Sequence, residues 1–308
     1  MKRLNLNTIT ILLLLSTLLF SACEDVVDVD INDEDIDLYS VEAYLTTKPS
    51  DNIRVKLEKT LPVNTADKNP SISNAIIEIS DNEPAQNKVI LEEIDNSGIY
   101  KLPENVTYEA VPGRTYQLSI TTIDGVVINA QEYLQKGETL DSTKIQLSAR
   151  GNYEYLAVYI NSQETPGLGH YYKWDIFING ELLNESEYLS FVNDELVDGN
   201  YVYDFEIYTD FGDPNDETDR NLFFGDTVYV EQLTISRNAY EFYTGMVNQA
   251  FAGGPFSVPP ANLASNFSAS DGKRVLGIFS VRDVSVGNTI VIDSTNYTPL
   301  VSSLMFLD

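Results

Sequence analysis

The chain has 308 residues, with 19 basic and 47 acidic side chains and a formal net charge of −28. This length suffices for one large or two ordinary domains. The charge argues against nucleic acid as a partner, because phosphate contacts need clustered lysine and arginine. A charge of this sign is typical of a protein that stays soluble outside the cell.

The first 22 residues have the pattern of a secretion signal. Lys2 and Arg3 form a short basic start, and residues 9–20 form a mostly apolar run that ends shortly before Cys23, the only cysteine. The run is too short to cross a bilayer, which takes about 20 apolar residues. The stretch resembles a bacterial lipoprotein signal, in which the peptidase cuts before the cysteine and the cysteine is then acylated. We therefore expect residues 1–22 to be removed and Cys23 to carry lipid.

The alternative for Cys23 is a stray free thiol in an ordinary secreted protein. Exported proteins tend to pair their cysteines or to avoid them, so a single cysteine at the end of an apolar run favours lipidation. Each buried methylene of the acyl chains contributes about 0.8 kcal/mol, which predicts permanent anchoring to the outer membrane.

Residues 23–37 form an acidic tether. Eight aspartates and glutamates lie between Glu24 and Asp37, and their mutual repulsion keeps such a segment extended and solvated. Glu24 and Asp25, directly after the cysteine, resemble the surface-export signal of Bacteroidota lipoproteins. We therefore expect exposure on the cell surface. The alternatives are a plain spacer and retention in the periplasm.

Residues 38–135 have the pattern of a β-sandwich. Apolar and polar residues alternate in several short runs, as in half-buried strands. Asp124 and Gly125 fit a tight turn between the last two runs. Several short strands with turn signals between them are typical of a sandwich. The predicted strands are 39–45, 53–57, 75–79, 88–94, 115–120 and 126–134.

Residues 136–308 are predicted to form a second β-rich domain, because 135–141 interrupts the strand pattern. One helix is predicted at about 237–250, with Ser236 as its N-cap. Its apolar positions recur at helical spacing and should face a sheet: Tyr240, Tyr243, Met246, Val247 and Ala250. The predicted strands are 144–147, 153–160, 171–178, 201–208, 227–236, 275–281 and 289–292.

The tract from Ala239 to Ser280 resembles the C-terminal signature of a Bacteroidota outer-membrane lipoprotein family catalogued as a domain of unknown function, and the chain is DUF4249-like. The elements shared with that family are Gly225-Asp226 before a strand, the aromatic helix, Pro260-Ala261-Asn262 with Asn266, and Leu276-Gly277 in a closing strand. The resemblance implies an immunoglobulin-like N-terminal region and an envelope lipoprotein often encoded near TonB-dependent transporters. It implies no catalytic residues.

Enzymatic chemistry has few candidate residues. His170 is the only histidine and is most simply a loop or strand-edge residue, so a two-histidine site is excluded. No Gly-x-Ser-x-Gly elbow or phosphate-binding loop occurs. Carboxylate pairs could in principle hydrolyse glycosidic bonds, but no motif marks one. We expect a non-enzymatic protein without catalytic residues.

The acidic segment 210–219 is a candidate calcium loop, and no other cofactor is expected. Its carboxylate and amide oxygens are the ligands that Ca²⁺ prefers. Thr218 stands where the EF-hand pattern needs glycine, and a solvated turn is the alternative. The candidate ligands are Asp213, Asn215, Asp216, Glu217 and Asp219.

Two further candidate sites are predicted, one in the loop-like segment 253–260 and one beside the linker 135–141. Phe256, between prolines that include Pro259 and Pro260, could anchor a partner or fold back onto the core. Ser142, in an Asp-Ser-Thr tripeptide, matches a pattern associated with O-glycosylation in that phylum.

Aromatic residues concentrate in the second half of the chain, where 12 of the 19 tyrosines fall between Tyr153 and Tyr243. Each is more simply a core or cross-strand residue than a binding platform, and Trp174 is predicted to lie in the core.

These observations favour a lipid-anchored binding or accessory protein of a TonB-dependent uptake system, with a TonB-dependent transporter as a partner. A structural or adhesion-type surface lipoprotein is the alternative, and a carboxylate-based hydrolase is the third.

Overall fold

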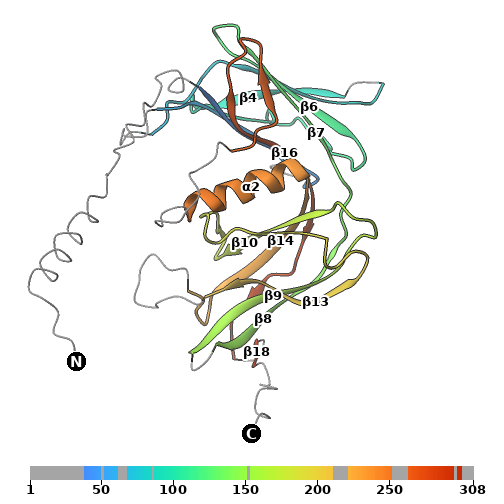
Figure 1. Ribbon diagram of the computed structural model, residues 1–308. Coiled ribbons are helices and arrows are strands. Elements are labelled where there is room, and N and C mark those ends of the chain that lie inside the picture. Colours follow the sequence, from blue (N-terminus) through green and yellow to red (C-terminus); the bar gives the residue numbers. More distant parts are fainter. Residues whose placement is uncertain are drawn as a thin grey trace, which may run out of the picture. The chain divides into compact units, whose positions relative to one another are not determined.

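The computed structural model describes residues 38–49, 52–61, 68–84, 87–150, 153–210, 221–251, 263–294 and 297–299 (Figure 1). The first strands are β1 (Tyr39–Thr46), β2 (Ile53–Lys59), β3 (Ile76–Asp81), β4 (Lys88–Ile94), β5 (Ile99–Lys101), β6 (Thr115–Thr121) and β7 (Val127–Tyr133). Then come β8 (Leu140–Arg150), β9 (Tyr153–Gln163), β10 (Tyr171–Ile178), β11 (Glu181–Leu182), β12 (Ser190–Asn193), β13 (Tyr201–Thr209) and β14 (Thr227–Ile235). The last elements are α2 (Arg237–Ala250), β15 (Phe267–Ala269), β16 (Val275–Val286), β17 (Ile290–Val291) and β18 (Tyr297–Pro299). The described part of the chain is thus mainly β with one helix, as predicted.

The N-terminal strands form a sandwich-like arrangement around one core. The alternating apolar residues of β1 and β2 pack against those of β3 and β6, and the fully buried members include Val41, Leu57, Ile79 and Leu118. Strand β4 pairs with both β3 and β5, so it carries the chain from one sheet to the other. Successive side chains of a strand point to opposite faces, so every second one enters the core. The matching alternation of apolar and polar residues is why these strands were predictable from the sequence.

Two late strands complete this sandwich. Strand β16 runs parallel to β1, from the pair Tyr39 and Val275 to the pair Thr46 and Arg282. Strand β15 pairs with the edge of β7. All described residues fall within one compact unit, Asp37–Asp308. The division into domains 38–135 and 136–308 stays a prediction.

A second core lies between the four-stranded sheet β13-β9-β8-β18 and one face of β10 and β14. Val158 and Ile160 of β9 contribute to it, together with Trp174 and Val230. Trp174 is 5% exposed, and its indole N–H donates to Gln232 Oε1 at 3.1 Å. Trp174 is therefore a core residue, as its strand pattern predicts.

Helix α2 has the predicted bounds, Arg237–Ala250, and lies beside β16 (Figure 1). The side chain of Ser236 accepts a hydrogen bond from the backbone N–H of Ala239 at 3.2 Å, which caps the helix. Ala239 and Tyr243 are buried against Leu233 and other residues of the sheet. Ala250 is exposed rather than facing the sheet, because the buried contacts come from the earlier turns.

One continuous sheet, in the order β10-β14-β16-β1-β2, joins the two cores. Even-numbered side chains of β10 and β14, such as Trp174 and Val230, enter the second core, and odd-numbered side chains of β1, such as Val41, enter the first. The remaining side chains of these strands share the opposite face, which α2 partly covers. Among the described residues, no helix is both long and apolar enough to span a membrane.

Glu132 of β7 provides a test of how this fold depends on pH. Its carboxylate is 6% exposed and accepts hydrogen bonds from Asn238 Nδ2 at 3.2 Å and Asn266 Nδ2 at 2.9 Å. Burial raises the pKa of Glu132, and these hydrogen bonds only partly oppose that increase. Glu132 therefore binds its proton more tightly in the folded state than in the unfolded state, and this difference stabilises the fold at low pH. The stabilisation is lost as the pH rises through the folded-state pKa.

We expect Glu132→Gln to remove this pH dependence. The free energy of unfolding of the wild type, measured relative to the variant by urea titration, should fall as the pH rises from 4.5, the ordinary pKa of a glutamate, to the raised folded-state pKa, because only the wild-type carboxyl ionises. A difference that stays constant across this range would show that Glu132 has no raised pKa.

Candidate functional site

A cleft with a volume of about 930 Å³ lies on the shared face of the β10-β14-β16-β1-β2 sheet, beside α2. Pockets for organic ligands commonly measure about 300–1,000 Å³. The strands place alternate side chains in it: Lys173, Asp175 and Phe177 from β10, Tyr229, Glu231 and Leu233 from β14, and Glu42 and Tyr44 from β1. Phe242, Tyr243 and Met246 of α2 close one side. The cleft is thus set on a sheet and a helix rather than on loops.

Three ion pairs lie in the cleft. Lys48 Nζ lies 2.6 Å from Glu231 Oε1, which is nearly buried, and Arg54 Nη1 lies 3.2 Å from Glu42 Oε1. Lys173 pairs with Asp175 on the same strand. Each of these three carboxylates therefore has a cation of its own.

A smaller apolar pocket of about 230 Å³ lies over the second core, on the other side of β10 and β14. Its walls include Tyr172, Trp174, Val192 and Phe205, and Glu164 lies at its polar end. Leu196, which also lines the pocket, is 96% exposed.

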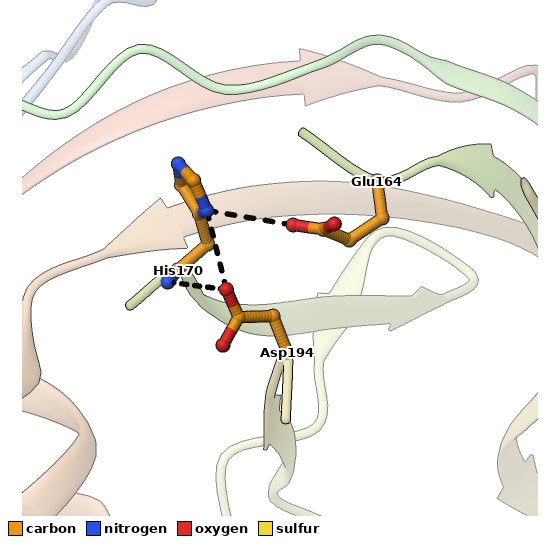
Figure 2. A group of neighbouring side chains, drawn as sticks. All are labelled: Glu164, His170 and Asp194. Atoms are coloured by element: carbon orange, nitrogen blue, oxygen red, sulfur yellow. Dashed lines mark hydrogen bonds and ion pairs between the residues drawn. The ribbon is translucent and has the colours of Figure 1, made fainter. Parts of the chain in front are cut away.

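Glu164, His170 and Asp194 meet beside this pocket (Figure 2). Glu164 follows β9, His170 precedes β10 and Asp194 follows β12. His170 Nδ1 lies 3.3 Å from Asp194 Oδ2 and 3.5 Å from Glu164 Oε1. Figure 2 shows the imidazole with this nitrogen turned toward both carboxylates.

The hydrogen bonds of this cluster connect three separate chain segments. Asp194 Oδ2 accepts the backbone N–H groups of Gly169 at 2.8 Å and His170 at 2.9 Å. Glu164 accepts the Tyr172 hydroxyl at 3.2 Å and the backbone N–H of Gly199. An imidazole and two carboxylates are also ligands that divalent metals accept. Both carboxylates already accept hydrogen bonds from backbone N–H groups. The cluster therefore links the ends of β9, β10 and β12.

Most of the sequence-predicted site residues lie outside the described residues. These are Cys23, Glu24 and Asp25, the candidate calcium ligands Asp213, Asn215, Asp216, Glu217 and Asp219, and the candidate interface Phe256, Pro259 and Pro260. Ser142 lies within β8, half-buried, and its hydroxyl accepts a hydrogen bond from Asn161 Nδ2 at 2.9 Å. Glycosylation of Ser142 stays a prediction.

The sequence contained one overlooked signal for the cleft. In β10, Lys173 and Asp175 alternate with Tyr172, Trp174 and Ile176, although all five residues are buried. Charges inside a buried strand indicate a polar face opposite the core. The Glu164, His170 and Asp194 cluster carried no such signal, because loops bring the three residues together.

Comparison with known proteins places the chain in a family. The family model of a domain of unknown function, DUF4249, matches residues 24–287. The chain belongs to this family. No curated protein and no solved structure matches it significantly. The match begins next to Cys23 and contains all the strands and the helix that line the cleft of this DUF4249 protein.

The residues on which the resemblance to the family rests have structural roles where they are described. Asp226 accepts the backbone N–H of Phe223 at 2.8 Å and the side-chain amide of Asn179 at 2.8 Å, which shapes the turn into β14. Asn266 bonds the backbone of Phe279 in β16. Gly277 allows β16 to approach β1 closely. These residues thus support the sheet that carries the cleft.

Proposed function

We propose that this protein is a non-catalytic binding or accessory lipoprotein, anchored in the outer membrane through Cys23 and serving a TonB-dependent nutrient-uptake system. The observation that carries the proposal is the cleft of about 930 Å³, which is large enough for an organic ligand and is set on a paired sheet. A binding protein needs such a preformed recess, whereas a purely structural lipoprotein does not.

Two features of the sequence support the location. The lipoprotein-like signal ends at Cys23, and the family match starts at the next residue, so the signal lies outside the family domain. The acidic segment after Cys23 would hold the folded part away from the membrane surface, because its carboxylates repel one another.

Replacing the anchoring residue tests the location. We expect Cys23→Ser to abolish fractionation with the outer membrane, because no acyl chain can then be attached. Membrane fractions and intact-protein mass should be measured together, so that the loss of lipid and the loss of anchoring are seen in one sample. Unchanged fractionation of Cys23→Ser would refute the anchor.

The double variant Glu24→Ala, Asp25→Ala is the matched control, since it keeps Cys23. It should remain lipidated and membrane-bound, but protease added to intact cells should no longer reach it if these residues direct surface export. Accessibility equal to that of the wild type would reject their export role without touching the anchor.

The uptake role is tested by cross-linking in native membranes followed by mass spectrometry. We expect a TonB-dependent transporter among the cross-linked partners of the wild type and its absence with Cys23→Ser. A lipidated protein that cross-links to no transporter would favour the structural or adhesion-type alternative.

A further inference from the structure

The cleft on the shared sheet face has a charge opposite to that of the whole chain. Five cations line it, Lys48, Arg54, Lys101, Lys173 and Arg282, against three carboxylates, Glu42, Asp175 and Glu231. The chain as a whole has a net charge of −28, with only 19 basic residues. The lining therefore carries more cations than carboxylates in an otherwise acidic protein, which favours an anionic ligand.

Arg282 is the cation that the cleft leaves without a carboxylate partner. The three carboxylates are paired with Lys48, Lys173 and Arg54, as described above. Within the described part of the chain, no carboxylate oxygen lies within 4.0 Å of the Arg282 guanidinium. Burial alone lowers the pKa of Arg282, but nearby acidic groups, Tyr243 and Asp175 first among them, leave that pKa raised. The guanidinium therefore stays charged.

Neutral groups hold this guanidinium in place. Nη2 donates to the Tyr243 hydroxyl and Nε to Ser280 Oγ, each at 3.0 Å, while the ring of Tyr44 lies 5.3 Å from the guanidinium carbon. These contacts, from α2, β16 and β1, fix the orientation of the group without neutralising it. A guanidinium that is held in place and has no carboxylate within 4.0 Å among the described residues is preorganised for a carboxylate ligand, whose two oxygens match its geometry.

Much of the remaining lining is apolar or aromatic, beside the polar Ser40, Thr46 and Asn184. Phe177 and Tyr229 stack with ring centroids 4.3 Å apart, and Leu189, Leu233 and Met246 add aliphatic surface. Such walls suit a ligand with an apolar or ring-shaped body, because burial of that body supplies affinity while the charged group gives orientation.

We propose that this cleft binds organic carboxylates, with Arg282 receiving the carboxylate and the Phe177 and Tyr229 pair contacting the body of the ligand. This inference rests on the proposed binding function and names the class of ligand. An inorganic anion alone would leave the aromatic wall without a contact.

Calorimetry with a matched pair of probes tests the proposal on the full-length protein purified in detergent. We expect 3-phenylpropanoate to bind saturably and the uncharged 3-phenylpropanamide to bind at least tenfold more weakly, because only the acid can pair with Arg282. Equal binding of acid and amide, or binding of neither, would overturn the proposal. This comparison needs no variant, so it remains decisive even if a substitution impairs folding.

Arg282→Met should reduce the affinity for 3-phenylpropanoate at least tenfold and leave the amide unaffected. Arg282→Lys should lie between the wild type and Arg282→Met, because it keeps the charge but loses the planar fork. Lys88→Met, on β4 and outside the cleft, is the control and should bind like the wild type. An Arg282→Met variant that melts like the wild type and binds the acid equally well would overturn the assignment.

The outcomes also separate this inference from the proposed function. If the acid fails to bind but the lipidated protein still cross-links to a transporter, recognition of carboxylates is rejected and the uptake role stands. If the acid binds but no transporter is found, the ligand class stands and the uptake role is rejected.

Discussion

Gly277→Ala is expected to destabilise the protein by about 3 kcal/mol or more, the largest effect that we predict for a single methyl group. Gly277 has φ +103, which side chains rarely adopt. A Cβ atom there would lie 1.9 Å from the carbonyl oxygen of Val41, its partner in β1. Either β16 must move away from β1 or both strands must distort, and β16 contributes to the N-terminal core through Phe279 and Val281. Urea unfolding followed by far-UV circular dichroism measures the loss.

Gly272→Ala is the matched control for this prediction. Gly272 also has a positive φ, +75, but an added Cβ would meet no atom within 4 Å. It should cost only the backbone strain, about 1 kcal/mol. Similar losses at both positions would show that strain alone, and not the contact between β1 and β16, makes Gly277 necessary.

Asn266→Ala is expected to destabilise the protein by about 2–4 kcal/mol, because it leaves buried backbone groups without partners. Asn266 Oδ1 accepts the N–H of Phe279 at 3.0 Å, and its Nδ2 donates to the carbonyl of Phe279 at 2.8 Å. The side chain thus replaces a neighbouring strand at this residue, whose own side chain is 0% exposed. The same Nδ2 donates to the buried Glu132.

Thermal and urea unfolding should both show the loss in Asn266→Ala. Ser268→Ala, two residues away, is the control, since its exposed hydroxyl makes only a 3.4 Å contact with the carbonyl of Asn129. It should change stability by no more than about 0.5 kcal/mol. If Asn266→Ala is equally mild, water must replace the amide at Phe279.

Both positions lie in the tract on which the resemblance to the family rests. Gly277 permits the close parallel pairing of β16 with β1. The side chain of Asn266 forms hydrogen bonds with the backbone of Phe279, two residues further along β16. Both act on the strand that also carries Arg282 into the cleft. Asn266 and Gly277 thus support the strands around the proposed site rather than supplying chemical groups to it.

Local structure was predictable where one residue pattern dominated. Strands β4 and β10 and helix α2 have the predicted bounds. In each element the spacing of the apolar residues along the sequence is that of the regular structure that buries them. Ser236 caps α2 as its residue type predicts. The short strands β5, β11, β12, β15 and β18 were not predicted, since two to four residues cannot display a period.

The sequence by itself determined the mainly β class, the single helix of the described residues, the core position of Trp174 and the membership of the family. These properties follow from patterns among near neighbours in the chain. Only the tertiary structure decided that β16 pairs with β1, more than 200 residues earlier, and that Arg282 contacts Tyr44 and Tyr243 while no carboxylate of the described residues lies within 4.0 Å of it. Such contacts depend on the pairing of strands that are distant in the sequence. The register of that pairing is set by which side chains must be buried on each face of the sheet, and this is not visible in either strand alone.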